Sequence, residues 1–433
     1  MIYPDRSTPP PVKDFGDLSI PEARYRTLDN GLTLCVVDQG DAPVCRVNCI
    51  FPGGIAECRS QVFPSLATSL IQEGTRYHSG EEIADTFEFN GAKIGVTGDS
   101  HFTGLSLHTL NSKASRVLEL LKEVILEPVF PDKALDVLKM KAMQQIELQH
   151  RKVEFKATEA IMRIEMGRNH PLAMCDTVES VSAISSSAIQ EWWDKEVTSG
   201  KGVLPKSTKL FAAGKITSDI EEDLNRTFGS IPLDEHAGMR LDIRPFSSQR
   251  GIRENIKVEG ALQSAVRIYS PAIDRKNPDY IKLRLLIMGL GGYFGSRLMN
   301  NIREDKGYTY GIQSYLLGHP EGGIIAIASS TDNSTVEPLV EETFNELKGL
   351  VTRPFSDGEI NRLKQYAMST LASTLDSPFD IMDYYINREV AFIEKGYFER
   401  QIEEIKHLTP SVLQEMAEKY IVTDNFSVVV AGA

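Results

Sequence analysis

The sequence predicts an α+β fold with two homologous domains, each a largely antiparallel sheet with helices packed on it. Three observations support this prediction. The chain has 433 residues, more than an ordinary single domain needs. It contains an internal repeat, and within the first copy strand-like segments precede and follow several helix-like segments.

The repeat is clearest near the end of each copy. Residues 184–191 (ISSSAIQE) and 408–415 (LTPSVLQE) both predict a helix that begins after a hydroxyl residue. Each leads into a β-rich run ending in Ala-Gly, at residues 209–214 (KLFAAG) and 426–432 (FSVVVAG). We therefore expect domains at residues 1–235 and 251–433. Turn formers and charges between them predict a linker at residues 236–250.

Within the first copy, residues 25–38 alternate apolar and polar side chains around Asn30-Gly31, which predicts a β-hairpin. A further strand is expected at residues 43–51. Helical periodicity predicts helices at residues 63–73, 80–90, 112–126 and 132–151. A single strand is expected at residues 95–110, where the odd separation of His101 and His108 places these side chains on opposite faces. They are not expected to bind a metal together.

Composition and charge restrict the partners. The formal net charge of −13 opposes binding to a phosphate backbone, and no segment is long and apolar enough to cross a bilayer. We therefore expect neither nucleic acid nor a membrane as a partner. The five cysteines have no C-x-x-C spacing, and the opening residues lack the apolar core of a secretory signal. These features predict a cytoplasmic protein with reduced thiols.

Several motifs occur in a specific order along the chain. Residues 28–32 (LDNGL) and 51–57 (FPGGIAE) come first, followed by residues 72–75 (QEGT) and 79–83 (SGEEI). In the second copy stand residues 288–298 (MGLGGYFGSRL) and 302–310 (IREDKGYTY). In this order the motifs resemble the zinc peptidase family of pitrilysin, insulin-degrading enzyme and mitochondrial processing peptidase. The resemblance implies that the chain forms one half of a clamshell.

Active members of that family carry H-x-x-E-H on the first helix, and the resemblance places Ser65, Thr68 and Ser69 at its three positions. Glu147 lies near the expected third ligand. Neutral hydroxyls are poor zinc ligands and one carboxylate cannot hold zinc alone, so we expect no metal or other cofactor in this chain. For Glu147 the alternative, an exposed charge on a helix, is favoured. A hydrolase using one of the hydroxyls as nucleophile is disfavoured, because no base is placed beside it.

Arg303 and Tyr310 are the residues expected to contribute to catalysis. The intervening Gly307 predicts a helix end followed by a turn into a strand. The resemblance implies that both side chains reach substrate at a zinc site, where a guanidinium and a phenol can donate hydrogen bonds to a peptide carbonyl and its oxyanion. The alternative is an ordinary surface arginine and a half-buried core tyrosine. Tyr308 is a close neighbour, but the spacing favours Tyr310.

These features predict the non-catalytic subunit of a two-chain zinc peptidase. Its partner would be a homologous subunit that carries H-x-x-E-H and holds the zinc, its substrates would be peptides, and no catalysis is expected from this chain alone. The alternative is an inactive scaffold homologue of the same fold, without a role in proteolysis. Such a scaffold would need neither Arg303 nor Tyr310.

Overall fold

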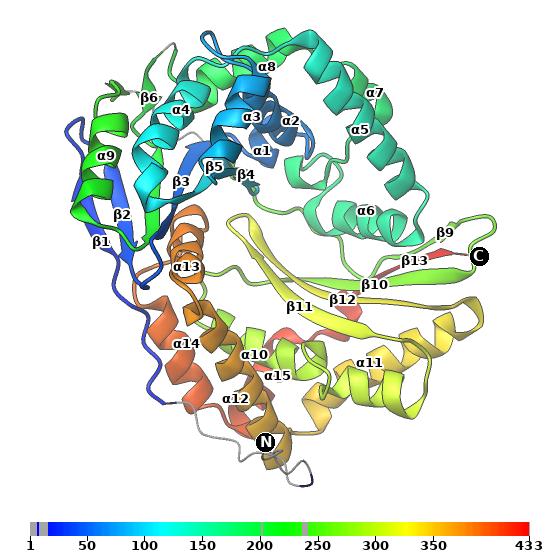
Figure 1. The fold of residues 1–433 in the computed structure, drawn as a ribbon. Coiled ribbons are helices and arrows are strands. Elements are labelled where there is room, and N and C mark those ends of the chain that lie inside the picture. Colours follow the sequence, from blue (N-terminus) through cyan, green and yellow to red (C-terminus); the bar gives the residue numbers. More distant parts are fainter. Residues whose placement is uncertain (1–6, 8–15, 201, 236–240, 433) are drawn as a thin grey trace.

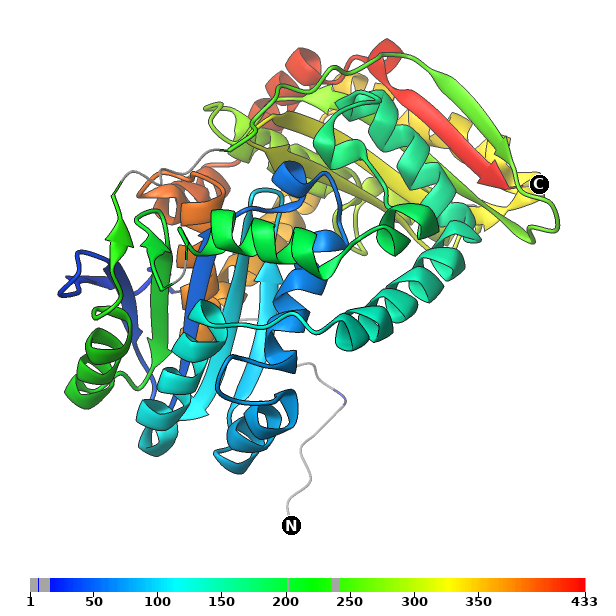
Figure 2. The same ribbon diagram turned by 90° about the horizontal axis from the view of Figure 1, so that it is seen from above.

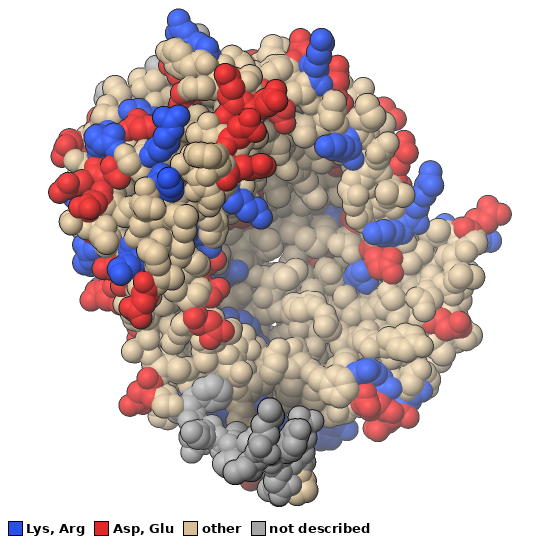
Figure 3. All heavy atoms as spheres, in the orientation of Figure 1, with Lys and Arg blue, Asp and Glu red and all other residues tan. Residues whose placement is uncertain are grey.

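Two sheets, each accompanied by helices, face one another across an open hollow (Figures 1 and 3). The computed structural model describes residues 7, 16–200, 202–235 and 241–432, so residues 236–240 of the predicted linker lie outside the described residues. The visible walls of the hollow carry mostly uncharged side chains, whereas acidic and basic side chains gather on the outer surface (Figure 3).

The N-terminal sheet has six strands. In spatial order they are β1 (Arg24–Thr27), β2 (Thr33–Asp38), β7 (Lys209–Gly214), β3 (Val44–Pro52), β5 (Phe102–Leu110) and β4 (Lys93–Gly98). Only the β2–β7 pair is parallel. The predicted hairpin is confirmed as β1 and β2. Its turn is anchored by Asn30, whose side-chain amide donates to the carbonyls of Phe228 at 2.9 Å and Ile231 at 2.7 Å.

The helices of the first half follow the predicted periodicity. Ser79 caps α3: its hydroxyl accepts the Glu82 amide, and the Glu82 carboxylate accepts the Ser79 amide. The helices that confirm the four predictions are α2 (Phe63–Leu70), continued by a 3₁₀ turn to Glu73, α3 (Gly80–Phe89), α4 (Ala114–Leu126) and α5 (Asp132–His150). The others are α1 (Ile55–Cys58), α7 (Val178–Ser182), α8 (Ser186–Trp192) and α9 (Ser218–Phe228).

The C-terminal sheet repeats the same plan. In spatial order its strands are β9 (Arg253–Lys257), β13 (Ser427–Gly432), β10 (Gln263–Ala272), β12 (Gly322–Asp332) and β11 (Ile312–His319). This order matches β2-β7-β3-β5-β4, and the only parallel pair, β9–β13, corresponds to β2–β7. Its helices are α10 (Tyr280–Gly291), α11 (Val336–Thr352), α12 (Asp357–Ala372), α14 (Tyr397–Lys406) and α15 (Pro410–Tyr420). The predicted α+β fold with two homologous units is confirmed.

Each half also lends one helix to the other. Helix α6 (Val153–Met166), from the first copy, packs against β10 and β13, and α13 (Pro378–Val390), from the second copy, packs against β7 and β2. Ile161 and Met382 are fully buried in these contacts. Burying such a side chain stabilises the folded state by about 1.5–3 kcal/mol. The exchange therefore ties the two halves together (Figures 1 and 2).

One predicted element is wrong. Residues 95–110 do not form a single strand but belong to two strands, β4 and β5, joined by a turn at residues 99–101. The Asp99 carboxylate accepts the backbone N–H groups of His101 at 2.8 Å and Phe102 at 2.9 Å, a local bond that favours a turn over an extended chain. As a result β4 is the edge strand, β5 lies inside the sheet, and His101 lies in the turn.

None of the helices in the described part of the chain is both long and apolar enough to span a bilayer. The five cysteines are free thiols, and three of them are buried. Burial raises the pKa of Cys45 to about 11, so this thiol stays protonated at neutral pH. The cytoplasmic location stays a prediction.

Candidate functional site

Helix α2 carries the positions that the resemblance assigns to the zinc motif. Its apolar residues Leu66, Ala67 and Leu70 are buried, so the helix packs as its periodicity predicts. Ser65 is exposed and Ser69 is partly buried. The hydroxyl of the buried Thr68 donates to the Pro64 carbonyl at 2.7 Å, a bond within the helix that occupies its only proton.

These residues do not fit a zinc ion. Glu147 is exposed on α5. The preceding residue, Ile146, packs against Leu66 of α2 instead. The structure contains no group of three or more histidine, cysteine, aspartate or glutamate side chains arranged to hold a metal within its described residues. Zinc selects imidazole, thiolate or carboxylate ligands, and α2 offers only neutral hydroxyls.

Arg303 and Tyr310 flank the predicted helix end. Arg303 lies on the π-helical turn Met299–Asp305, and Gly307 follows with φ +66°, a conformation that favours glycine. The Gly307 amide donates to the Arg303 carbonyl at 3.2 Å, and β11 then begins at Ile312. The predicted order of helix, turn and strand is confirmed.

Both side chains are accessible. Tyr310 is 92% exposed and has no hydrogen-bond partner among the described residues, so it is not a half-buried core tyrosine. The Arg303 guanidinium lies over the Phe294 ring, 4.5 Å from its centre, and its Nη1 is 3.4 Å from the partly exposed Glu304. Tyr308, in contrast, is partly buried against the C-terminal core. Arg303 and Tyr310 can therefore donate to a ligand without losing an internal hydrogen bond.

The structure does not bring this pair together with the α2 positions. Helix α2 packs on β4, β5 and α5 of the first half, whereas the turn that bears Arg303 packs on α11 and β11 of the second half. Across the described chain, no hydrogen bond, ion pair or ring contact joins the two sets.

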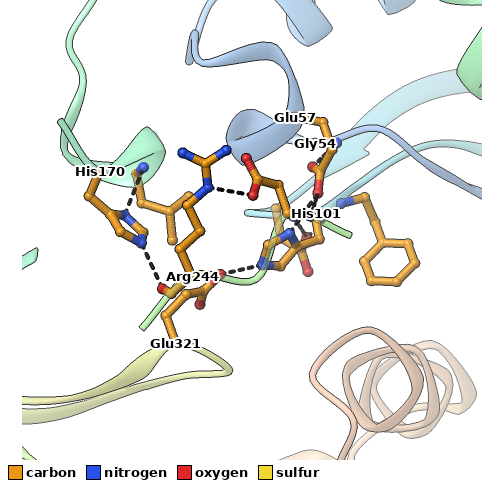
Figure 4. A network of polar contacts seen from close by, with 10 residues as sticks. Gly54, Glu57, His101, His170, Arg244 and Glu321 are labelled. Carbon is orange, nitrogen blue, oxygen red and sulfur yellow. Dashed lines mark hydrogen bonds and ion pairs between the residues drawn. The ribbon is translucent and has the colours of Figure 1, made fainter. Parts of the chain in front are cut away.

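A second cluster lies where the two halves meet (Figure 4). His101, in the β4–β5 turn, is only 1% exposed. Its Nδ1 lies 2.9 Å from a carboxylate oxygen of Glu57 on α1, and its Nε2 lies 2.5 Å from one of Glu321. Because Glu321 belongs to the turn between β11 and β12, one imidazole joins both halves of the chain.

Charge explains why the cluster can be buried. Burial by itself would lower the pKa of His101, but the bonds to Glu321 and Glu57 outweigh it and raise this pKa to about 9. Burial also opposes the charge of Glu321, yet its bond to His101 leaves the pKa of this carboxyl below its ordinary value. At neutral pH the cluster is therefore an imidazolium between two carboxylates.

The described part of the predicted linker is bound to this cluster. The Asp242 amide donates to Glu57 at 3.1 Å, and the Phe246 amide donates to the Glu321 carbonyl at 3.2 Å. His170 Nε2 donates to the Arg244 carbonyl at 2.9 Å (Figure 4). The connection between the halves is thus fixed at several points.

Sequence reasoning missed this cluster. Glu321 is 220 residues from His101, and no periodicity or short motif links them. A partial signal lies in the FPGGIAE motif. A Cβ on Gly54 would stand 2.5 Å from the His101 backbone nitrogen, so this position needs glycine for the turn to pack on α1.

Comparison with known proteins identifies related chains. The family described as Insulinase (Peptidase family M16) matches residues 66–174, and the description Peptidase M16 inactive domain matches residues 203–366. A Bacillus subtilis protein named uncharacterized zinc protease YmxG is 22% identical over 307 residues, which cover 70% of this chain and 72% of that protein.

Solved structures share the fold. A peptidase M16 inactive domain from Pseudomonas fluorescens matches with a TM-score of 0.82 at 22% identity, over 95% of this chain and 98% of that one. The periplasmic protease PqqL from Escherichia coli matches with a TM-score of 0.76 at 14% identity. That match covers 98% of this chain but 49% of the E. coli chain, so the longer protein contains this fold within about half of its length.

Proposed function

Because the chain belongs to the insulinase-like M16 peptidase family and has hydroxyl side chains at the zinc-motif positions, we propose that it is the non-catalytic subunit of a two-chain zinc peptidase. Its partner is a homologous subunit that carries H-x-x-E-H and holds the zinc. The observation that carries this proposal is the free state of Tyr310, which is 92% exposed and unbonded within the described residues. A phenol hydroxyl without an internal hydrogen bond is available to donate to a ligand or partner.

In the proposed complex, Arg303 and Tyr310 bind the peptide carbonyl that is attacked in the partner's active site. The guanidinium can only donate hydrogen bonds, and the phenol can donate one. Both can therefore stabilise an oxygen that gains negative charge. The rare π-helical geometry at Arg303 supports a functional role, because such turns occur frequently at functional sites. The stacking of Arg303 on Phe294 limits the motion of its guanidinium before substrate binds.

Two further features support a role as half of an enclosure. The chain is hollowed on the face seen in Figure 3, and its edge strand β4 leaves one row of backbone groups unpaired within the sheet. An extended peptide can add to such an edge. The match of this whole chain to about half of PqqL shows that the same fold also occurs in a chain of about twice the length.

Affinity purification of the chain from its source cell tests the proposal. We expect a homologous subunit with H-x-x-E-H to copurify, and we expect the complex, but not this chain alone, to hydrolyse peptides in a chelator-sensitive manner. Arg303→Ala should lower turnover by about a hundredfold. Arg353→Ala, which removes another partly exposed arginine of the second half, is the matched control. Chelator-sensitive hydrolysis by the isolated chain, with about one zinc per chain, would refute the proposal.

The second candidate is a scaffold of the same fold. The description Peptidase M16 inactive domain over residues 203–366 favours it, as do Phe89 on α3 and Tyr77 in the loop before α3, which are 87% and 63% exposed. A scaffold would copurify with a stable assembly that contains no zinc peptidase. In that case Arg303→Ala would leave the assembly and its activity unchanged.

A further inference from the structure

A cavity of about 570 Å³ lies in the C-terminal half. Its walls come from α10, α12, α14 and α13, the helix that packs on the sheet of the other half. The volume is within the range of small-molecule sites, which is about 300–1,000 Å³. None of the residues discussed above as candidate functional residues lines it.

Two arginines line this cavity without a counter-ion. Neither Arg275 nor Arg284 forms an ion pair with a described residue, and Arg275 forms no hydrogen bond with one either. Arg284 bonds only the neutral side chain of Gln401, and its Nε is buried without a partner. Arg297, by contrast, is a buried arginine of the same half with a counter-ion. Its Nε lies 2.8 Å from the carboxylate of Glu359 on α12.

The acidic side chains in the wall already have partners. Asp383 is paired with Arg46 of β3, which reaches it through both of its terminal nitrogens. Asp380 accepts the hydroxyl of Ser377 at the start of α13. Neither acid therefore neutralises Arg275 or Arg284 by contact.

The same wall contains a further unpaired group. Tyr397 is only 6% exposed, and its hydroxyl has no hydrogen-bond partner among the described residues. A buried polar atom without a partner is uncommon and destabilises the folded state. Together with Arg275 and the Nε of Arg284, it leaves donors in this wall that no described acceptor meets, which favours a ligand that brings acceptors and a negative charge.

The lining also contains apolar side chains beside the polar Thr370, Ser373, Thr374 and Asn387. Met288, Leu316, Leu371, Ile393 and Phe398 contribute to it. A free phosphate or sulfate ion would leave these side chains without a partner, whereas a carboxylate with an apolar body would contact both parts of the wall. Arginine binds carboxylates with two parallel hydrogen bonds, which also fixes their orientation.

We propose that this cavity binds a small carboxylate-bearing molecule with an apolar body, whose carboxylate is held by Arg275 and Arg284. The site is separate from Arg303 and Tyr310 and does not depend on a peptidase role. Because α13 forms part of the wall and packs on the N-terminal sheet, the bound molecule contacts a helix that links the halves.

Calorimetric titration of the full chain tests this proposal, with N-acetyl-leucine as the probe and its uncharged amide, N-acetyl-leucinamide, as the matched compound. We expect the acid to bind and the amide to bind at least about tenfold more weakly, because hydrogen bonds to a charged group are stronger than those to a neutral amide. Arg275→Gln and Arg284→Gln should each weaken binding of the acid by about tenfold.

Arg253→Gln is the control, because Arg253 lies on β9 of the same half and pairs with the exposed Glu337 outside the cavity. Circular dichroism establishes that each variant is folded. If Arg284→Gln unfolds, Arg275→Gln decides alone, since Arg275 makes no hydrogen bond within the described chain. Three results would overturn the proposal: no binding of the acid at millimolar concentration, equal binding of acid and amide, or binding of inorganic phosphate as tight as that of the acid.

Discussion

The His101 cluster yields the sharpest prediction about stability. His101→Gln replaces a charged imidazole by an amide that can donate to only one of the two carboxylates. Raising the pKa of His101 from 6.5 to about 9 corresponds to about 3 kcal/mol. Solvent screening makes the stabilisation lost on substitution smaller than this value. The unpaired charge left on Glu321, whose side chain is 0% exposed, makes the loss larger. We expect His101→Gln to lower the free energy of unfolding by about 2–4 kcal/mol near neutral pH.

The pH dependence gives this prediction a distinctive sign. The pKa of His101 is higher in the folded than in the unfolded chain, so its contribution is complete below about pH 6.5 and disappears as the pH rises through about 9. The difference in stability between wild type and His101→Gln should therefore shrink between about pH 6 and about pH 10. Urea unfolding followed by the fluorescence of Trp192 and Trp193 measures it.

The control is His407→Gln, because His407 is an exposed histidine beside Glu403 at the end of α14. We expect its unfolding midpoint to match the wild type at both pH values. Equal stability of wild type and His101→Gln near pH 6, or a difference between them that grows towards pH 10, would refute the reasoning.

Three further predictions concern other positions. Burial raises the pKa of Glu165 to about 8, so the folded state loses stability as the pH rises from about 4.5 to 8. Glu165→Leu should therefore raise the melting temperature, and the increase should be larger at about pH 8 than at about pH 5. Gly54→Ala places a Cβ 2.5 Å from the His101 backbone and should lower the urea midpoint by an amount equivalent to about 2–4 kcal/mol. Arg46→Ala removes the ion pair with Asp383 and should speed proteolysis of α13, whereas an unchanged cleavage rate would contradict the anchoring role.

Local patterns in the sequence predicted much of the fold. The Asn30-Gly31 hairpin and the apolar periodicity of α2 to α5 are properties of short segments, and each segment adopts the expected structure. The predicted helix starts in the two repeat copies are also confirmed. The hydroxyls of Ser185 and Thr409 each accept the backbone N–H of the residue three positions later. Duplication therefore predicted two domains of similar plan, and the strand orders of the two sheets match.

Features that depend on distant contacts were not predictable. The exchange of α6 and α13 joins segments whose patterns are ordinary for amphipathic helices, so nothing local distinguishes the sheet on which each packs. The turn at Asp99 depends on the two hydrogen bonds that this one side chain accepts inside an otherwise strand-like run. The cluster around His101 depends on Glu321, which comes from the other half of the chain. The roles of Arg303 and Tyr310 stay predictions.

In the proposed complex, the Tyr310 phenol of this chain acts in the reaction at the active site of the partner. Measuring kcat/KM of the reconstituted complex for a model peptide, with Tyr310→Phe in this chain, tests it most directly. We predict a fall of about a hundredfold for Tyr310→Phe and no change for Tyr308→Phe, two residues away and partly buried. Equal activity of the wild-type and Tyr310→Phe complexes would contradict the account.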